Sequence, residues 1–234
     1  AGFSIFKNKR TIFQPELDIS LKSKIKDIIF NLSLKNFLNN SSFSKLYFQS
    51  PYSTISTSLE PERVFRLEGG IELKRKSLCL KNSLFLENKN GAIEWHKKAD
   101  GLYEPRNLAS LFSCGIKGNI NYSLTKKIEG EFSAILMGLS KEINYTPQFE
   151  GELILRYRDK DLLISPYISF RGSQKTDNGN IDSCLVFNIK GEKKISDEFG
   201  AFFNLENLFN SQYKEREDYP GKKLLVSMGI KIKL

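Results

Sequence analysis

Residues that build metal centres and covalent catalysts are scarce in this chain of 234 residues, which has one histidine and three cysteines. The single histidine, His96, lies in a polar segment, and a metal site normally requires several ligands, so we interpret His96 as an exposed loop residue. A Ser-His-acid hydrolase would need the same histidine, oriented by an acid and placed beside a serine. Because the sequence shows no such arrangement, we expect neither an enzyme nor a bound cofactor or metal.

The cysteines also exclude a disulfide-rich fold. Cys79, Cys114 and Cys184 lie far apart, and both their odd number and their spacing argue against a disulfide framework and against a metal site. Each cysteine lies within an alternating run of apolar and polar residues, so we interpret all three as small strand residues.

Long apolar runs are absent as well. The mean hydropathy is −0.36, and no stretch of about 20 apolar residues exists, which excludes a transmembrane helix. It does not exclude a transmembrane β-barrel, because barrel strands alternate and average out as mildly polar. The chain opens Ala-Gly-Phe, without an initiator methionine or a signal peptide, so we interpret it as a mature form or a piece of a longer protein.

A basic cluster is missing too, although the formal net charge is +9. Lys and Arg occur in twos and threes along the whole length, and no basic helix or aromatic-basic module gathers them. This distribution is typical of cations at turns and on a solvated face. We therefore expect no nucleic-acid partner.

What the chain does contain is regular alternation of apolar and polar residues. In the closing stretch, Val226, Met228, Ile230, Ile232 and Leu234 alternate with small or cationic residues. Successive side chains of a strand point to opposite faces, so this pattern predicts a strand with one apolar face. Comparable runs cover residues 16–22, 28–35, 62–74, 78–87, 112–122, 128–139, 149–158, 162–171, 181–190 and 199–206.

Short turns and longer polar loops alternate between these runs. The turns lie near Lys24, Arg75, Lys126, Lys160 and Lys193, and the loops cover residues 40–61, 88–107, 140–147, 172–180 and 207–222. About eleven or twelve antiparallel strands, with short connections at one end and long ones at the other, are typical of an outer-membrane barrel. No segment has a convincing apolar period of 3.6, so we expect little helix.

The aromatic residues on the predicted outer faces indicate the same architecture. They gather at the two ends of the strands and leave aliphatic residues between them: Phe65, Phe112, Phe149 and Phe170 at the loop ends, and Tyr122, Tyr157 and Phe199 at the turn ends. Two aromatic belts around an aliphatic band match the two lipid–water interfaces. We therefore expect an all-β, antiparallel transmembrane barrel. Two alternatives stay open: a small passive pore or structural barrel, and a soluble β-sandwich that binds carbohydrate or protein.

Several motifs, taken in series, resemble the TonB-dependent outer-membrane receptors. At the C-terminal end these are Asn207-Leu208-Phe209-Asn210, Tyr213, Tyr219-Pro220-Gly221-Lys222 and an alternating last strand. Earlier motifs are Phe43-Ser44-Lys45-Leu46-Tyr47, Leu59-Glu60-Pro61-Glu62, Glu68-Gly69-Gly70, Gly115-Ile116-Lys117-Gly118 and Tyr145-Thr146-Pro147. The chain departs from the family pattern at Lys222, where Arg is usual, and at Leu234, where a terminal aromatic residue is commoner.

The resemblance implies that residues 1–234 form a single domain, the C-terminal half of a barrel that has 22 strands in the family, without the plug domain. It implies a location in the bacterial outer membrane and uptake of a scarce nutrient chelate, such as iron-siderophore or cobalamin. Its partners would be outer-membrane lipid, the barrel-insertion machinery, which reads the last strand, and TonB, which would act through a plug absent from this chain. The candidate ligand-facing loop residues are Tyr47, Tyr52, Trp95, His96, Tyr103, Tyr213 and Tyr219.

Paired carboxylates are the remaining candidates for chemistry. Glu150 and Glu152 share one strand face with arginines, and we expect charge pairing inside the barrel rather than acid-base catalysis. If Leu234 ends at the periplasm, all five long loops lie outside the cell and all five short turns lie in the periplasm.

Overall fold

The chain forms one large antiparallel sheet of twelve strands, seen in a computed structural model that describes residues 2–7, 11–39, 53–54 and 59–232. The order in the sheet is β1-β2-β3-β4-β5-β8-β9-β10-β11-β14-β15-β18. Their bounds are β1 Gly2–Lys7, β2 Thr11–Ile25, β3 Ile28–Asn39, β4 Glu62–Lys74, β5 Leu78–Asn90, β8 Ser110–Ser123, β9 Ile128–Leu139, β10 Phe149–Asp159, β11 Leu162–Arg171, β14 Cys184–Lys194, β15 Phe199–Glu206 and β18 Leu225–Ile232.

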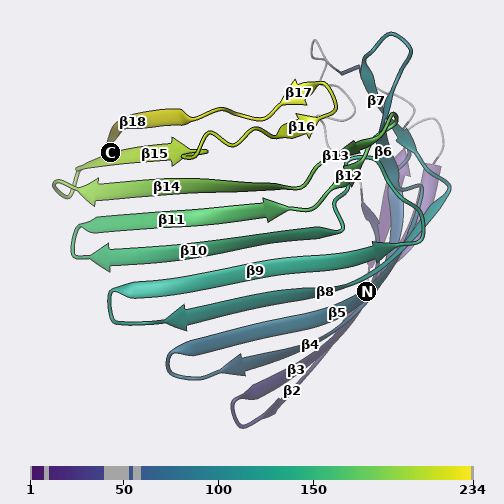
Figure 1. Cartoon of the computed structure of the whole chain (residues 1–234). Coiled ribbons are helices and arrows are strands. Elements are labelled where there is room, and N and C mark those ends of the chain that lie inside the picture. Colours follow the sequence, from purple (N-terminus) through teal and green to yellow (C-terminus); the bar gives the residue numbers. More distant parts are fainter. Residues whose placement is uncertain (1, 8–10, 40–52, 55–58, 233–234) are drawn as a thin grey trace.

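Three small hairpins lie outside this sheet, in the long connections. They pair β6 Ile93–Lys97 with β7 Tyr103–Asn107, β12 Gln174–Lys175 with β13 Asn180–Ile181, and β16 Lys214–Arg216 with β17 Tyr219–Pro220. Figure 1 shows the short turns along one end of the sheet and the long connections with their hairpins at the other. Within the described part of the chain, no helix is long and apolar enough to cross a membrane.

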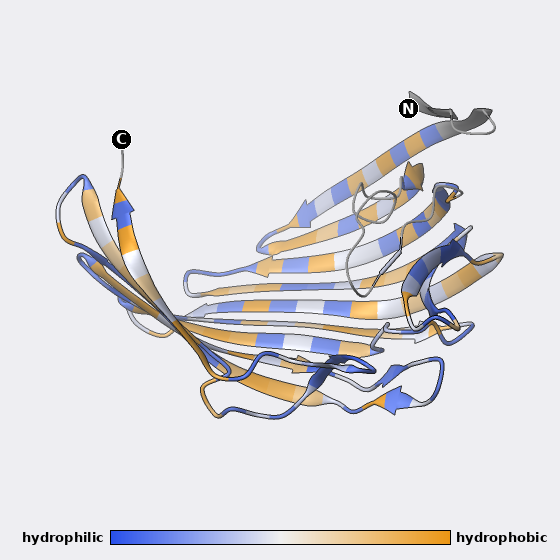
Figure 2. Cartoon of the chain, turned by 90° about the horizontal axis from the view of Figure 1, so that it is seen from above, coloured by the Kyte–Doolittle hydropathy of each residue, from blue (hydrophilic) through white to orange (hydrophobic). Residues whose placement is uncertain are grey.

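The sheet is curved, and its two edges stay apart (Figures 1 and 2). At one edge, β18 pairs only with β15 among the described residues. At the other edge, β2 is long: Leu17–Ile25 pair with β3, while residues 11–16 project beyond β3 and pair with β1. The residues that the structure describes contain no ladder between the first and last segments of the chain.

Alternation of side chains gives the sheet two different faces. We call the concave face that lines the cavity described below the inner face, and its opposite the outer face. Outer positions carry exposed aliphatic residues such as Leu84, Ile116 and Leu153, which are 62%, 50% and 42% exposed. Among the described residues, thirty-one large hydrophobic side chains are exposed and only nine hydrophobic residues are buried. Figure 2 shows the resulting alternation of hydrophilic and hydrophobic residues along the strands. No second sheet covers the outer face in the described ranges, which excludes the β-sandwich alternative for them.

The inner face carries paired charges. Arg66 bridges Glu68 and Glu87, with N–O distances of 2.8 and 3.4 Å. Arg156 contacts Glu131 at 2.7 Å from the neighbouring strand. Ion pairs in a water-filled concavity lose less solvation than pairs in a dry core, so a polar wall of this kind suits a hydrated interior.

The expected pairing of Glu150 and Glu152 with arginines is wrong. Neither carboxylate has an ion-pair partner within 4 Å among the described residues, although Glu150 is opposite Arg171 in the ladder. The two side chains line a cavity instead. The other expectations for the sheet are confirmed: the strands are antiparallel, the turns and loops alternate, and the three cysteines are free strand residues.

The small buried core lies at the loop end rather than in the middle of the sheet. Ala92, Leu111 and Ile143 pack together and connect the loop after β5 with the loop after β9. Leu59 and Tyr103 are each only 1% exposed in the same end of the molecule. Apolar burial therefore stabilises the loops, while the strands depend on their ladders and on whatever covers the outer face.

One aromatic residue on the inner face depends on a glycine opposite it. Phe85 on β5 is 5% exposed and pairs with Gly115 on β8. Its ring lies 4.9 Å from the Arg66 guanidinium carbon and 5.2 Å from the Lys117 ammonium nitrogen, measured to the ring centroid. A Cβ on Gly115 would lie 2.7 Å from the ring and 2.4 Å from the Leu136 carbonyl oxygen. Only glycine leaves room for this aromatic residue between two cations.

Gly115→Ala is expected to destabilise the folded protein by about 1–3 kcal/mol, because the added methyl group collides with a backbone oxygen and with a packed ring. The measurement is reversible urea unfolding of the protein in detergent or lipid. Gly138→Ala is the matched control, since its nearest neighbour would be the Cys114 sulfur at 3.8 Å, which is ordinary contact. Equal stabilities of the two variants would contradict this account of Phe85.

Candidate functional site

A cavity of about 1330 Å³ opens on the inner face beneath the loops. Its wall is built by inner positions of neighbouring strands, including Lys117, Ser133, Glu152, Tyr167 and Ser169. Its loop side is closed by the β6–β7 and β16–β17 hairpins, whose residues Trp95, Tyr103, Arg216 and Tyr219 also line it. The cavity therefore combines charged and aromatic side chains, and most of the aromatic ones lie on the loop side.

The loop side is organised around Arg216 of β16. Its guanidinium carbon lies 4.8 Å from the ring centroid of Trp95, 5.2 Å from Tyr103 and 5.4 Å from Tyr145. A guanidinium within about 6 Å of several ring faces is held by cation–π attraction. The Tyr145 hydroxyl donates to the Tyr103 hydroxyl at 3.0 Å, and burial raises the pKa of Tyr145, which therefore stays neutral. Three separate loops are thereby joined at one side chain.

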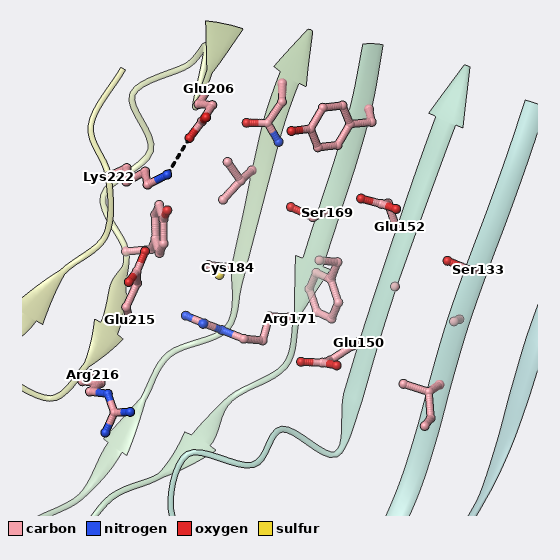
Figure 3. A pocket seen from close by; sticks show the side chains of 18 of the residues that line it. Ser133, Glu150, Glu152, Ser169, Arg171, Cys184, Glu206, Glu215, Arg216 and Lys222 are labelled. Atoms are coloured by element: carbon pink, nitrogen blue, oxygen red, sulfur yellow. Dashed lines mark hydrogen bonds and ion pairs between the residues drawn. The ribbon is translucent and has the colours of Figure 1, made fainter. Parts of the chain in front are cut away.

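Two arginines present buried N–H groups in this region. Arg216 Nη1 and Arg171 Nε are both buried and have no hydrogen-bond acceptor among the described residues. Arg171 Nη2 donates to the Lys214 carbonyl oxygen at 2.6 Å, which ties β11 to the β16–β17 hairpin. Figure 3 shows Arg171 and Glu150 on neighbouring strands, facing the hairpin that carries Glu215 and Arg216. Buried donors without acceptors are costly, so an acceptor group entering the cavity would be bound favourably here.

The loop after β15 is anchored by Asn207, which is 1% exposed. Its amide Nδ2 donates to the carbonyl oxygens of Ser211 at 2.9 Å and Lys222 at 2.7 Å, and its Oδ1 accepts from the Ser211 N–H at 2.8 Å. Its φ of 53° lies in the left-handed region, where Asn is among the better tolerated residues. The Asn-Leu-Phe-Asn motif is thus a structural anchor that positions Tyr213 and the β16–β17 hairpin.

A second anchor is Asp177, in the loop after β11. Its carboxylate accepts hydrogen bonds from the Lys97 backbone N–H at 2.8 Å and the Asn144 amide at 2.7 Å, and His96 Nδ1 lies 3.2 Å away. Burial alone would raise the pKa of Asp177, but these contacts outweigh it, and the pKa lies below its ordinary value. One carboxylate therefore connects three of the long connections at the loop end of the sheet.

The structure brings most of the predicted ligand-facing residues together. Trp95, Tyr103, Tyr213 and Tyr219 line the cavity, and Tyr103 and Tyr219 are in edge contact, with centroids 6.2 Å apart. His96 does not line it and lies beside Asp177. Tyr47 and Tyr52 fall outside the described residues. Whether any of these side chains contacts a ligand stays a prediction.

Sequence reasoning missed Arg171, Arg216, Tyr145 and Asp177. Arg171 and Arg216 are two of many spaced cations, and nothing in the sequence marks the pair as neighbours. Tyr145 could have been found, because it precedes Thr146-Pro147 in a segment already noted for its motif. Within the described ranges, no cluster of three or more His, Cys, Asp or Glu side chains could hold a metal ion.

Comparison with solved structures identifies the fold. The chain is similar to the copper transporter OprC (TM-score 0.73, 14% identity, 96% of this chain and 40% of that one). It is also similar to the ferric enterobactin receptor PfeA of Pseudomonas aeruginosa (0.70, 13%, 95% and 40%) and to the ferric-catecholate import receptor Fiu of E. coli K12 (0.68, 14%, 95% and 35%). No protein-family profile and no curated protein matches the sequence.

These similarities show the fold of this chain and how much of each matched structure it covers. The chain spans 35–40% of the length of the structures it matches. It therefore has the fold of part of the β-barrel of outer-membrane receptors. The fold that the motifs predicted is thereby confirmed.

Asp177→Ala is expected to loosen the three loops by about 1–2 kcal/mol, because it removes a charged acceptor from several donors at once. Hydrogen exchange of residues 93–107 and 140–148 measures the effect. Asp182→Ala is the control, since Asp182 is an exposed carboxylate in the same loop. Comparable loosening in both variants would contradict the anchoring role.

The same contact predicts a pH dependence. The folded pKa of Asp177 is below its unfolded value of about 3.9, so the stabilisation is complete above that value and is lost as the pH falls through the folded pKa. The protection of these loops, expressed relative to the intrinsic amide exchange rate at each pH, should therefore decrease below about pH 4 in the native protein and change little in Asp177→Ala.

Proposed function

We propose that this chain forms part of an outer-membrane transporter barrel that captures a scarce nutrient chelate, such as an iron-siderophore or cobalamin, for uptake energised by TonB. The observation that carries the proposal is the outer face: aliphatic side chains are exposed along one face of strand after strand, with no protein layer over them in the described residues. A soluble protein rarely exposes an apolar surface of this extent. A lipid bilayer covers it without any further protein.

The open edge supports a larger barrel. The free edge of β18 presents unpaired backbone N–H and C=O groups, and each such group costs several kcal/mol in hydrocarbon. In a membrane, further strands must pair with this edge and with the edge of β2. The partial coverage of the similar structures agrees with this requirement.

The cavity supports ligand capture. It has the volume for a drug-sized or larger molecule, and it combines aromatic surfaces with the buried N–H groups of Arg171 and Arg216. The similar structures bear names that refer to copper, ferric enterobactin and ferric catecholates. We assign a nutrient chelate to this chain as a class, and the lining, with four Lys and Arg and four Glu, offers both donors and acceptors for its polar groups.

A pair of adjacent substitutions tests the membrane assignment. Leu153→Lys places a charge on the outer face in the middle of β10 and should cost about 2–4 kcal/mol of stability in a bilayer, whereas Ile154→Lys on the inner face should cost far less. Urea unfolding from lipid vesicles measures both. Equal tolerance of the two substitutions would overturn the barrel in a membrane.

The fluorescence of Trp95 reports ligand binding directly, because Trp95 is the only tryptophan and lines the cavity. Titration of the reconstituted protein with a panel of ferric siderophores and cobalamin should quench Trp95 fluorescence with one class of ligand. Arg171→Ala should weaken that binding, and Arg75→Ala in a distant turn should not.

Growth assays then distinguish uptake energised by TonB from passive diffusion through a small pore. Cells that depend on the protein should lose growth on the identified chelate when TonB is deleted. Growth that persists without TonB, together with conductance in a planar bilayer and no Trp95 response, would instead favour the small passive pore.

A further inference from the structure

The end of the sheet that carries the short turns is a strongly basic surface. We define the turn rim as the five short connections with two residues of each flanking strand, residues 24–29, 73–79, 122–129, 158–163 and 193–200. The turn rim contains eleven Lys and Arg but only six Asp and Glu. The five turns are scattered in sequence, and the antiparallel topology places them side by side at one end (Figure 1).

The loop end does not share this excess. The four fully described long connections, counted in the same way as residues 89–111, 138–150, 170–185 and 205–226, contain eleven cations and eleven carboxylates. If the cations of the turn rim served solubility alone, the solvated loops would need them equally. The charge asymmetry between the two ends therefore calls for a partner at the turn rim.

Most of the cations in the turn rim are exposed and available. Lys74, Lys127 and Lys194 form ion pairs with Glu72, Asp159 and Asp197. The other eight are exposed and have no carboxylate within 4 Å among the described residues: Lys24, Lys26, Arg75, Lys76, Lys126, Arg158, Lys160 and Lys193.

Exposed apolar side chains stand among these cations. Ile25, Leu124 and Ile195 are 60%, 54% and 65% exposed at three of the turns, and Tyr122 and Phe199 are 46% and 45% exposed beside them. These side chains continue the apolar outer face to the level of the turns. Cations beside aromatic and aliphatic side chains are typical of the headgroup region of a membrane. There the aromatic rings lie at the interface between lipid and water, and the cations reach the lipid phosphates.

We propose that the turn rim binds the anionic phospholipid headgroups of the leaflet at the turn end of the barrel. This proposal rests on the membrane location proposed above, and it adds a lipid class and the residues that recognise it. Phosphatidylglycerol supplies the chemistry required, one negative phosphate per headgroup beside an acyl surface. Attraction between a basic protein border and anionic lipid is electrostatic, so it should be weakened by salt.

The test measures which lipids are extracted together with the protein from a bilayer of mixed composition. The chain, together with the strands that complete its barrel, is reconstituted in vesicles of four parts phosphatidylcholine and one part phosphatidylglycerol. It is then extracted with a styrene–maleic acid copolymer, and the lipids extracted with it are quantified by mass spectrometry. We expect phosphatidylglycerol to be enriched about threefold over the vesicle ratio in 50 mM salt, and not enriched in 500 mM salt.

Matched variants locate the binding surface. A turn variant combining Arg75→Gln, Lys76→Gln, Lys126→Gln and Lys160→Gln should lose most of the enrichment. A loop variant combining Lys98→Gln, Lys141→Gln, Lys214→Gln and Lys223→Gln removes the same charge from the other end and should keep it.

The outcomes separate the two proposals. A complete barrel containing this chain that fails to enter vesicles of any composition overturns the membrane assignment. Protein that enters them without enrichment, with enrichment that survives 500 mM salt, or with equal enrichment in the turn and loop variants overturns the turn rim as a lipid site. Enrichment of phosphatidylglycerol at the two salt concentrations is measured on the wild-type protein. The proposal can therefore be refuted even if the turn variant does not fold.

Discussion

The antiparallel ladder that joins the strands from β2 to β18 is the constraint on which every other feature of this protein depends. It satisfies the backbone groups within the sheet, so the outer face needs no water and can be apolar. It also makes successive side chains point to opposite faces of the sheet, so that Leu153 is exposed on the outer face and its neighbour Ile154 lies on the inner face. A register slip of one residue would exchange the two faces of a strand, and the charged wall at Arg66 and Glu68 would meet lipid.

The sheet could be predicted from the sequence because its determinants are local. Alternation and turn chemistry are visible within ten residues, and they predicted the strands and the order of turns and loops. The site could be predicted only in part. Trp95 and Tyr103 were recognisable as large loop aromatics, but the position of Arg216 against their rings depends on three loops that meet only in the folded chain. Likewise, the sequence indicated scattered cations, and only the topology collects those of the turns at one end.

The loops and the sheet are stabilised in different ways. Around the cavity, Asn207 and Asp177 fix backbone groups of neighbouring segments, and the cluster of Ala92, Leu111 and Ile143 provides the apolar burial. The loop hairpins are thus held by a few polar contacts over a small core. Such contacts can be exchanged for contacts with a bound molecule at modest cost, whereas rearrangement of the sheet would break many ladder bonds at once.

The direction of the two edge strands restricts how the sheet can close. β1 pairs only with the projecting part of β2, so eleven strands, from β2 to β18, form the continuous wall. Eleven is odd, and both β2 and β18 run toward the turn end. If the wall met itself, or a second copy in the same orientation, its edges would pair in parallel. A barrel that is antiparallel throughout therefore requires an odd number of additional strands, with both of their outermost members running toward the loop end.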